Sequence, residues 1–261
     1  MIKDYHMHPT VINDPGRVHS FAERAIAMGI DEICVTDHMP LSVSNAADRI
    51  PAGRVEEYCR AVRRMAEEYE GRLSVKLGIE IDYHPDFSEE IGRVLAAGKY
   101  DFVLGSSHLH VTCPELLDGR TGFNEYAGYM IRNSILAARS GLVDSVAHLD
   151  FYRWMFTLPE RFPLTDDGYE VKKHEKLIDE LLYVLREEGV RLEINSHLAA
   201  KTGSLIHTYP EMEIAERAIE SGVKFSFGSD AHRPEHVGAH LDALRLHLVY
   251  GRAIREWEEN A

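Results

Sequence analysis

Histidines with the spacing of metal ligands stand close to the start of this sequence. His6 and His8 follow a short apolar segment and are two residues apart. Alternate side chains of an extended strand point the same way, so we expect both imidazoles to project from one strand end. Imidazole nitrogen suits first-row metals such as zinc, manganese, iron or cobalt. The pair therefore predicts one edge of a metal site whose other ligands come from elsewhere in the chain.

Further potential ligands recur along the chain, each just after an apolar run rich in Val, Ile, Leu and Phe. The pairs are His6 and His8, Asp37 and His38, Glu80 and Asp82, His108 and His110, His148 and Asp150, Asn195 and His197, and Asp230 and His232. A chance distribution would place histidines at both ends of the apolar runs. Their placement at one end predicts a polynuclear site with nitrogen and oxygen ligands, which fits zinc, manganese or iron.

The apolar runs alternate with amphipathic segments in a repeated order of strand and helix. The expected strands are residues 2–5, 32–36, 74–81, 101–105, 144–147, 191–194 and 224–227. The expected helices lie near residues 18–28, 55–69, 88–97, 123–140, 169–188, 210–221 and 236–258. This order predicts parallel strands with helices packed outside them, in one domain over residues 1–261.

The two ends of these units have different connections. Most helices end close to a glycine that is expected to adopt the left-handed conformation of a helix cap, namely Gly29, Gly71, Gly98, Gly141, Gly189 and Gly222. The connections from strand to helix are long, notably residues 37–54, 106–122, 149–168 and 196–209. Long ordered loops are usually functional. Short connections at one end of the units and long connections at the other indicate an α/β barrel with its site at the carboxyl ends of the strands. The chain has seven such units rather than the usual eight.

Composition argues against several classes of protein. A formal net charge of −14 disfavours tight non-specific binding of nucleic acid, because that affinity comes largely from lysine and arginine. Three widely spaced cysteines, an odd number, argue against a disulfide framework. No apolar run approaches the length of a membrane span and no secretory signal is evident, so we expect a cytoplasmic protein. Its oligomeric state stays open.

Six motifs carry a resemblance to a known family. They are Asp4-Tyr5-His6-Met7-His8, Thr36-Asp37-His38, Gly78-Ile79-Glu80, Gly105-Ser106-Ser107-His108, His148-Leu149-Asp150 and Gly228-Ser229-Asp230-Ala231-His232-Arg233-Pro234. Together and in this order they resemble the polymerase and histidinol phosphatase (PHP) family of metal-dependent phosphoesterases. The last motif and the chain length are most similar to the histidinol-phosphate phosphatase branch.

The resemblance implies both a fold and a metal centre. The fold would be a distorted (β/α)7 barrel similar to a TIM barrel, with parallel strands inside and helices outside. The centre would hold two or three divalent ions, either zinc, manganese or iron. The implied ligands are His6, His8, Glu80 and Asp230 for the first ion, Glu80, His108 and His148 for the second, and His38 and His232 for the third.

The loop after the first strand departs from the family's pattern. The family usually supplies another histidine to the third ion there, whereas residues 9–16 read PTVINDPG. Asn13, Asp14 and His19 are the residues near the expected place, and the sequence leaves open which of them completes the site. Asp37 is either a ligand or a group that orients His38, and the second interpretation is favoured.

The expected reaction follows from adjacent divalent ions, which lower the pKa of a shared water and neutralise charge on phosphoryl oxygens. We expect a metal-bridging hydroxide to attack a small phosphate monoester in line, with histidinol phosphate as the type of substrate. The candidates for catalytic roles are Glu80, which can bridge two ions, Asp37 and Asp150, with His110 and His197 as alternatives to Asp150 for the acid. The candidates for binding the phosphate are Arg153, Lys201 and Arg233.

Three other functions are alternatives to hydrolysis of a phosphate monoester. Hydrolases of amides also begin with a His-x-His pair, but they bridge their metals through a modified lysine, whereas this chain offers Glu80. A phosphodiesterase or nucleotide hydrolase of the same family is disfavoured because few lysines and arginines lie in the expected loops. A metal-stabilised scaffold without activity is disfavoured because most of the family's ligands are present.

Overall fold

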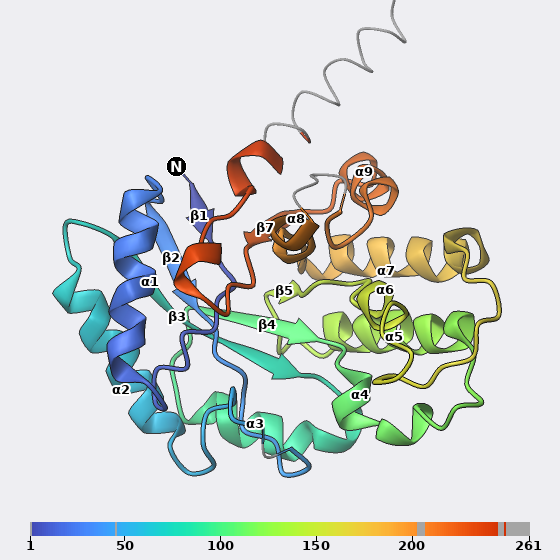
Figure 1. The fold of residues 1–261 in the computed structure, drawn as a ribbon, viewed down its shortest axis with the longest axis horizontal. Coiled ribbons are helices and arrows are strands. Elements are labelled where there is room, and N and C mark those ends of the chain that lie inside the picture. Colours follow the sequence, from blue (N-terminus) through green and yellow to red (C-terminus); the bar gives the residue numbers. More distant parts are fainter. Residues whose placement is uncertain (1, 45, 203–206, 245–247, 249–261) are drawn as a thin grey trace, which may run out of the picture.

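In the described part of the chain, seven parallel strands follow one another in chain order and form the inner wall of the molecule (Figure 1). The computed structural model describes residues 2–44, 46–202, 207–244 and 248. The strands are β1 (Lys3–Asp4), β2 (Glu32–Val35), β3 (Ser74–Asp82), β4 (Phe102–Ser106), β5 (Ser145–Val146), β6 (Arg191–Asn195) and β7 (Phe225–Gly228). Each strand pairs in parallel with the next one along the chain, as expected from the alternating pattern.

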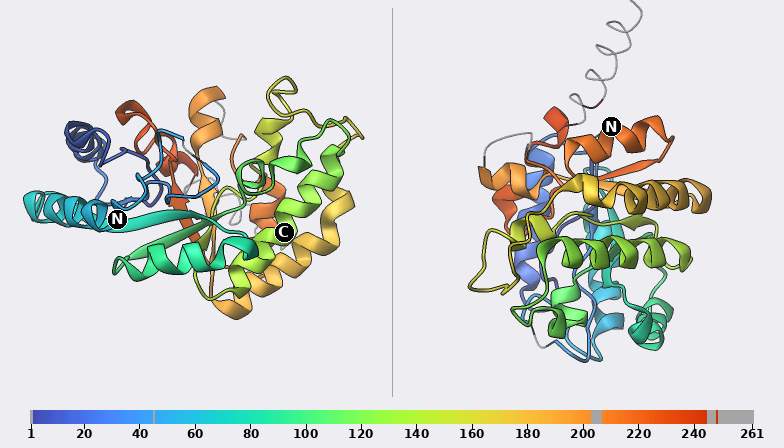
Figure 2. Two further views of the ribbon diagram at one scale, coloured as in Figure 1. Left: turned by 90° about the horizontal axis from the view of Figure 1, so that it is seen from below. Right: turned by 90° about the vertical axis from the view of Figure 1, so that its right-hand side faces the viewer.

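The first and last strands also meet, and this contact closes the sheet. The backbone N–H of Tyr5 donates to the carbonyl of Phe227 at 2.9 Å, and that of His8 donates to the carbonyl of Ala231 at 2.8 Å. Figure 2 shows the helices arranged around the strands. The expected barrel of the TIM type, with parallel strands inside and helices outside, is therefore confirmed.

Amphipathic helices connect the strands and cover the outside of the barrel. The longer ones are α1 (Pro15–Ala27), α2 (Val55–Glu68), α3 (Ser88–Ala96), α5 (Phe123–Arg139), α7 (Glu175–Glu188) and α9 (Met212–Glu220). They correspond to the first six expected helices, although α7 begins only after a 3-10 turn at Val171–His174. Of the last expected helix, residues 245–247 and 249–258 lie outside the described residues.

The long connections run from the carboxyl end of a strand to the next outer helix. Three of them contain a short helix within the described residues, namely α4 (Leu109–Thr112), α6 (Tyr152–Met155) and α8 (His197–Thr202). By contrast, the connections from helix to strand are short. Gly189, for example, ends α7 in the left-handed conformation, with a φ of 69°, directly before β6. The elaborate loops therefore lie together at one end of the barrel.

One glycine differs from the expected helix caps. Gly29, Gly71, Gly141, Gly189 and Gly222 have φ between 69° and 78°, but the φ of Gly98 lies outside the left-handed region. A Cβ at Gly98 would come within 2.7 Å of Cys59 Sγ and 3.0 Å of the Tyr100 ring. Close packing, rather than a left-handed turn, therefore explains the glycine at this position.

A continuous apolar core lies between the helices and the outer face of the strands. Phe21 on α1, Val62 on α2 and Ile33 on β2 are fully buried in it, and Leu77 on β3 is nearly so. This core fixes the strand ends, and thereby the loops that follow them, because tightly packed interiors resist displacement. No helix in the described ranges is both long and apolar enough to cross a membrane.

Candidate metal centre

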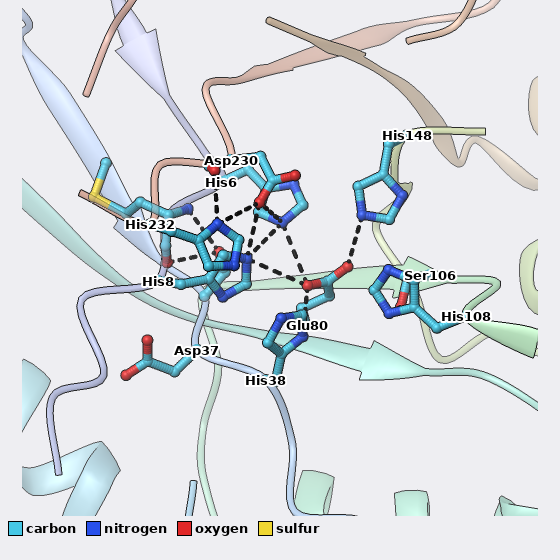
Figure 3. A network of polar contacts seen from close by, with 12 residues as sticks. His6, His8, Asp37, His38, Glu80, Ser106, His108, His148, Asp230 and His232 are labelled. Carbon is cyan, nitrogen blue, oxygen red and sulfur yellow. Dashed lines mark hydrogen bonds and ion pairs between the residues drawn. The ribbon is translucent and has the colours of Figure 1, made fainter. Parts of the chain in front are cut away.

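Imidazoles and carboxylates from far-apart parts of the sequence meet at the carboxyl end of the barrel (Figure 3). Those brought together are His6 and His8 after β1, His38 after β2, Glu80 on β3, His108 after β4, His148 after β5, and Asp230 and His232 after β7. All except His232 are buried. The structure thus gathers every residue that the motifs indicated as a metal ligand.

The carboxylate of Glu80 lies at the middle of this cluster. Its Oε2 atom is 3.4 Å from Nε2 of both His6 and His8 and 2.9 Å from Nδ1 of His38. Its Oε1 atom is 3.1 Å from Nε2 of His148. One carboxylate therefore faces imidazoles from three different strand ends, which is the arrangement that a bridging ligand needs.

The polar atoms of the cluster are poorly satisfied by the protein itself. Among the described residues, both carboxylate oxygens of Glu80, Nδ1 of His8 and Nδ1 of His38 are buried without a well-formed hydrogen bond, although Glu80 lies within ion-pair distance of His38 and His148. Burial alone would raise the pKa of Glu80, but the facing imidazoles of His38 and His6 hold that pKa well below its ordinary value. Buried polar groups normally have partners. Converging imidazole nitrogens and carboxylate oxygens of this kind fit divalent zinc, manganese or iron.

The donor atoms form overlapping groups, each within 4.8 Å. They are His6, His8 and Asp230; His6, Glu80 and His148; His8, His38 and His232; His38, Asp82 and His108; and His197, Asp230 and His232. The first two groups agree with most of the ligands that the resemblance implied for the first and second ions. His108 differs, because it groups with Asp82 and His38 rather than with Glu80 and His148.

An ion-pair chain that the sequence did not predict holds His108. Its Nδ1 atom lies 2.7 Å from one carboxylate oxygen of Asp82, and the guanidinium of Arg49 binds the other oxygen. Burial raises the pKa of Asp82, but Arg49 and His108 more than offset this and hold it below its ordinary value. Arg49 belongs to a long loop without periodicity, so only the folded chain shows that its side chain is buried beside the cluster.

Two ligand candidates have an unusual backbone. His148 has a φ of 21° and Asp230 a φ of 50°, in the region that glycine normally occupies. Such conformations persist only where the surroundings hold them, and they are concentrated at functional sites. Here they turn both side chains toward the cluster (Figure 3).

Two carboxylates with predicted catalytic roles hold loops in this structure. Asp37 accepts hydrogen bonds from the backbone N–H groups of Thr10 and Val11 at 2.9 and 2.8 Å, and Figure 3 shows it turned away from the cluster. Burial raises the pKa of Asp37 to about 6. Asp150 accepts from Arg153 at 2.9 Å and from the backbone N–H of Glu211 at 2.8 Å. Their catalytic roles stay predictions.

A cavity of about 670 Å³ opens onto the cluster. Among the predicted phosphate contacts, Lys201 and Arg233 line it, together with Arg17, Arg49 and Arg161, which sequence reasoning did not single out. Arg153 is not among the lining residues. Its guanidinium is held in ion pairs with Asp150 and Glu211, each at 2.9 Å.

None of the residues considered for completing the third ion site belongs to the donor groups found among the described residues. Asn13 donates to the carbonyl of Ala47 at 2.7 Å, and His19 Nδ1 lies 3.3 Å from the hydroxyl of Tyr69. Asp14 precedes the first turn of α1. His197 instead reaches this region, with its Nδ1 atom 3.1 Å from the carbonyl of Asp230.

Comparison with known proteins gives relatives that span the chain. Residues 4–197 match the PHP domain family. A protein of Deinococcus radiodurans named "Probable histidinol-phosphatase" is 31% identical over 269 residues, which cover 96% of this chain and 95% of that protein. The histidinol-phosphatase of Bacillus subtilis is 28% identical, with 93% of this chain and 97% of that protein covered.

A solved structure of similar fold agrees with these sequence relatives. The histidinol phosphate phosphatase of Lactococcus lactis, in complex with zinc, L-histidinol and phosphate, has a TM-score of 0.71 and 19% identity over 94% of this chain and 92% of that one. At this identity the likeness supports the fold. Together with the matched domain and the sequence relatives, it confirms what the motifs indicated: the chain belongs to the PHP family of metal-dependent phosphoesterases.

Proposed function

We propose that this enzyme hydrolyses histidinol phosphate to histidinol and phosphate, with two or three divalent metal ions. The observation that carries the proposal is the buried carboxylate of Glu80, which faces imidazoles from three strand ends below an open cavity. The names of the sequence relatives, and the ligands of the Lactococcus lactis structure, support histidinol phosphate as the substrate. Zinc in that structure supports zinc as one suitable metal.

The protein's own residues provide the metal ligands. The proposed set is His6, His8, His38, Glu80, His108, His148, Asp230 and His232, with Glu80 as the bridging carboxylate. Bound divalent ions supply a water of lowered pKa and neutralise charge on phosphoryl oxygens. His197 is a further candidate ligand, since its donor atom groups with those of Asp230 and His232.

The cavity above the cluster offers groups that suit each part of the substrate. Lys201 and Arg233 place cationic groups on its lining, where they can bind phosphate oxygens. Phe151 and Trp154 line the same cavity and provide apolar surface for an imidazole ring, while Asp48 provides a carboxylate for the ammonium group. This lining suits a cationic phosphate monoester whose phosphate faces the metal ligands.

A turnover assay on the metal-free and reconstituted chain tests this proposal. After chelation, the protein should not hydrolyse histidinol phosphate, and added zinc or manganese should restore turnover. The panel should include other monoesters, phosphodiesters and amides, and metal analysis should find at least two equivalents per chain. Turnover of amides alone, or turnover that survives chelation, would contradict the proposal.

A further inference from the structure

Strand β6 carries a charged residue inside the barrel, Glu193, which is not one of the proposed metal ligands. Glu193 stands between Leu192 and Ile194 and is only 1% exposed. An ionised carboxylate at such depth is very unfavourable unless it is paired and hydrogen-bonded. The partners of Glu193 therefore indicate what keeps it there.

Its two oxygens contact different sides of the metal cluster. Oε1 lies 2.6 Å from Nδ1 of His6. Oε2 accepts a hydrogen bond from the backbone N–H of His148 at 2.7 Å and another from the side-chain amide of Asn195 at 3.1 Å. A single carboxylate on β6 thus joins the loop after β1 to the loop after β5.

The contact with His6 determines which nitrogen of that ring is free. A carboxylate at Nδ1 favours the tautomer with the proton on Nδ1, because a carboxylate can only accept. The lone pair of Nε2 then points into the cluster, where Nε2 lies 3.4 Å from Glu80 Oε2 and 3.7 Å from Asp230 Oδ1. Hydrogen bonds of this kind orient histidine ligands around metals.

The contact with His148 acts on the backbone instead. The φ of 21° at His148 is unfavourable for a residue with a side chain, by about 1 kcal/mol or more. The hydrogen bond from its N–H to Glu193 holds this conformation, which places Nε2 of His148 3.1 Å from Oε1 of Glu80. Glu193 therefore stabilises the turn that presents this imidazole.

A glycine on the neighbouring strand makes room for the arrangement. A Cβ at Gly228 on β7 would collide with Oε1 of Glu193 and with Cβ of His6. The close approach of Glu193 and His6 to this strand thus explains why the motif of residues 228–234 begins with a glycine. This packing leaves Glu193 little freedom to choose other partners.

We propose that Glu193 is the positioning residue of the metal centre: it sets the tautomer of His6 and fixes the backbone of His148, so that both imidazoles face Glu80. The inference rests on the metal centre of the proposed function and is independent of the proposed substrate.

Metal affinity measured without substrate tests the proposal. In Glu193→Gln the side chain keeps its size but has one accepting oxygen, which cannot serve both His6 and His148. Zinc affinity, measured by competition with a chelator, should fall by about 10–100-fold. The matched control is Glu32→Gln, because Glu32 is also a buried glutamate on a barrel strand but is hydrogen-bonded to Lys3 and Ser74. Its zinc affinity should equal that of the wild type.

A second measurement tests the tautomer of His6 even if the variant does not fold. In wild-type protein labelled with ¹⁵N-histidine and loaded with zinc, the His6 resonances should show a proton on Nδ1. A proton on Nε2, or an unchanged zinc affinity in folded Glu193→Gln, would overturn the role of Glu193. If the wild type itself binds no metal, the proposed function fails instead, so the two failures are distinguishable.

Discussion

The two arginines that were predicted to bind phosphate differ in the protein groups that they already contact. Arg233 lines the cavity and is largely exposed, with Glu235 at 3.5 Å as its ion-pair partner. Arg153 is half-buried and held by two carboxylates and by the carbonyl of Thr208. A guanidinium with several short protein contacts is poorly placed to bind a ligand as well. The two arginines therefore lead to different expectations, although both were predicted to bind phosphate.

Replacing Arg233 should weaken substrate binding. In Arg233→Ala we expect KM for a phosphorylated substrate to rise about tenfold, because a charge-assisted hydrogen bond of about 1.5 kcal/mol is lost. Steady-state kinetics on the metal-loaded enzyme measures this. Arg120→Ala is the control, since Arg120 is exposed, pairs with Asp118 and does not line the cavity. An unchanged KM in Arg233→Ala would remove this residue from the phosphate site.

Replacing Arg153 should instead lower stability. In Arg153→Ala the carboxylate of Asp150, which is fully buried, loses its cationic partner. Breaking a buried ion pair in this way costs about 3 kcal/mol, because a charge is left without compensation. Denaturant unfolding should show that loss, while KM changes little. A raised KM with unchanged stability would mean that Arg153 contacts the phosphate after all.

Strand β3 shows how one element can place several functional groups. Side chains at every second position face the inside of the barrel, so Gly78, Glu80 and Asp82 share that face. Glu80 and Asp82 hold imidazoles from different loops, and Gly78 lies below them. A Cβ at Gly78 would lie 2.5 Å from Cys34 Sγ and 2.8 Å from the methyl group of Thr36. The strand therefore depends on a glycine to approach β2 closely.

Adding one methyl group to β3 should destabilise the barrel. We expect Gly78→Ala to lower the free energy of unfolding by about 1–3 kcal/mol, because the new atom overlaps packed neighbours. Gly92→Ala is the matched control in helix α3, where a Cβ would meet nothing within 4 Å. That variant should gain about 0.5–1 kcal/mol, since alanine suits a helix interior better than glycine. Equal effects of the two substitutions in denaturant unfolding would contradict this account.

The whole molecule has a different charge cluster at each end of the barrel. The carboxyl end carries the cluster of predicted metal ligands. The amino end carries Glu32, which accepts from Lys3 at 2.6 Å, from Ser74 at 2.9 Å and from the hydroxyl of Tyr5. Burial by itself raises the pKa of Glu32, but the hydrogen bonds from Lys3, Tyr5 and Ser74 lower it to about 2. The amino end therefore contributes to stability through an ionised carboxylate.

This contribution should depend on pH. The pKa of Glu32 is lower in the folded chain than its ordinary value of 4.5, so its stabilising effect is complete above about pH 5. It is lost as the pH falls from 4.5 toward 2. The free energy of unfolding of the wild type should therefore fall over this range by about 1 kcal/mol more than that of Glu32→Gln. Parallel pH profiles in urea unfolding would show that Glu32 does not contribute.

The sequence by itself determined the order of strands and helices and the end of the barrel where the predicted metal ligands gather. These follow from local patterns, because hydrophobic periodicity defines the elements and the motifs directly follow the strands. Family membership also followed from the motifs, and the expected barrel and the family are confirmed. The single domain over residues 1–261 stays a prediction.

Only the tertiary structure decided which charged residues serve the site and which hold the loops. Arg49 reaches Asp82, Arg153 binds Glu211, and Glu193 joins His6 to His148 across long stretches of sequence. Such contacts depend on how loops and strands approach one another in space. Periodicity carries no information about those distances, so they appear only when the barrel closes.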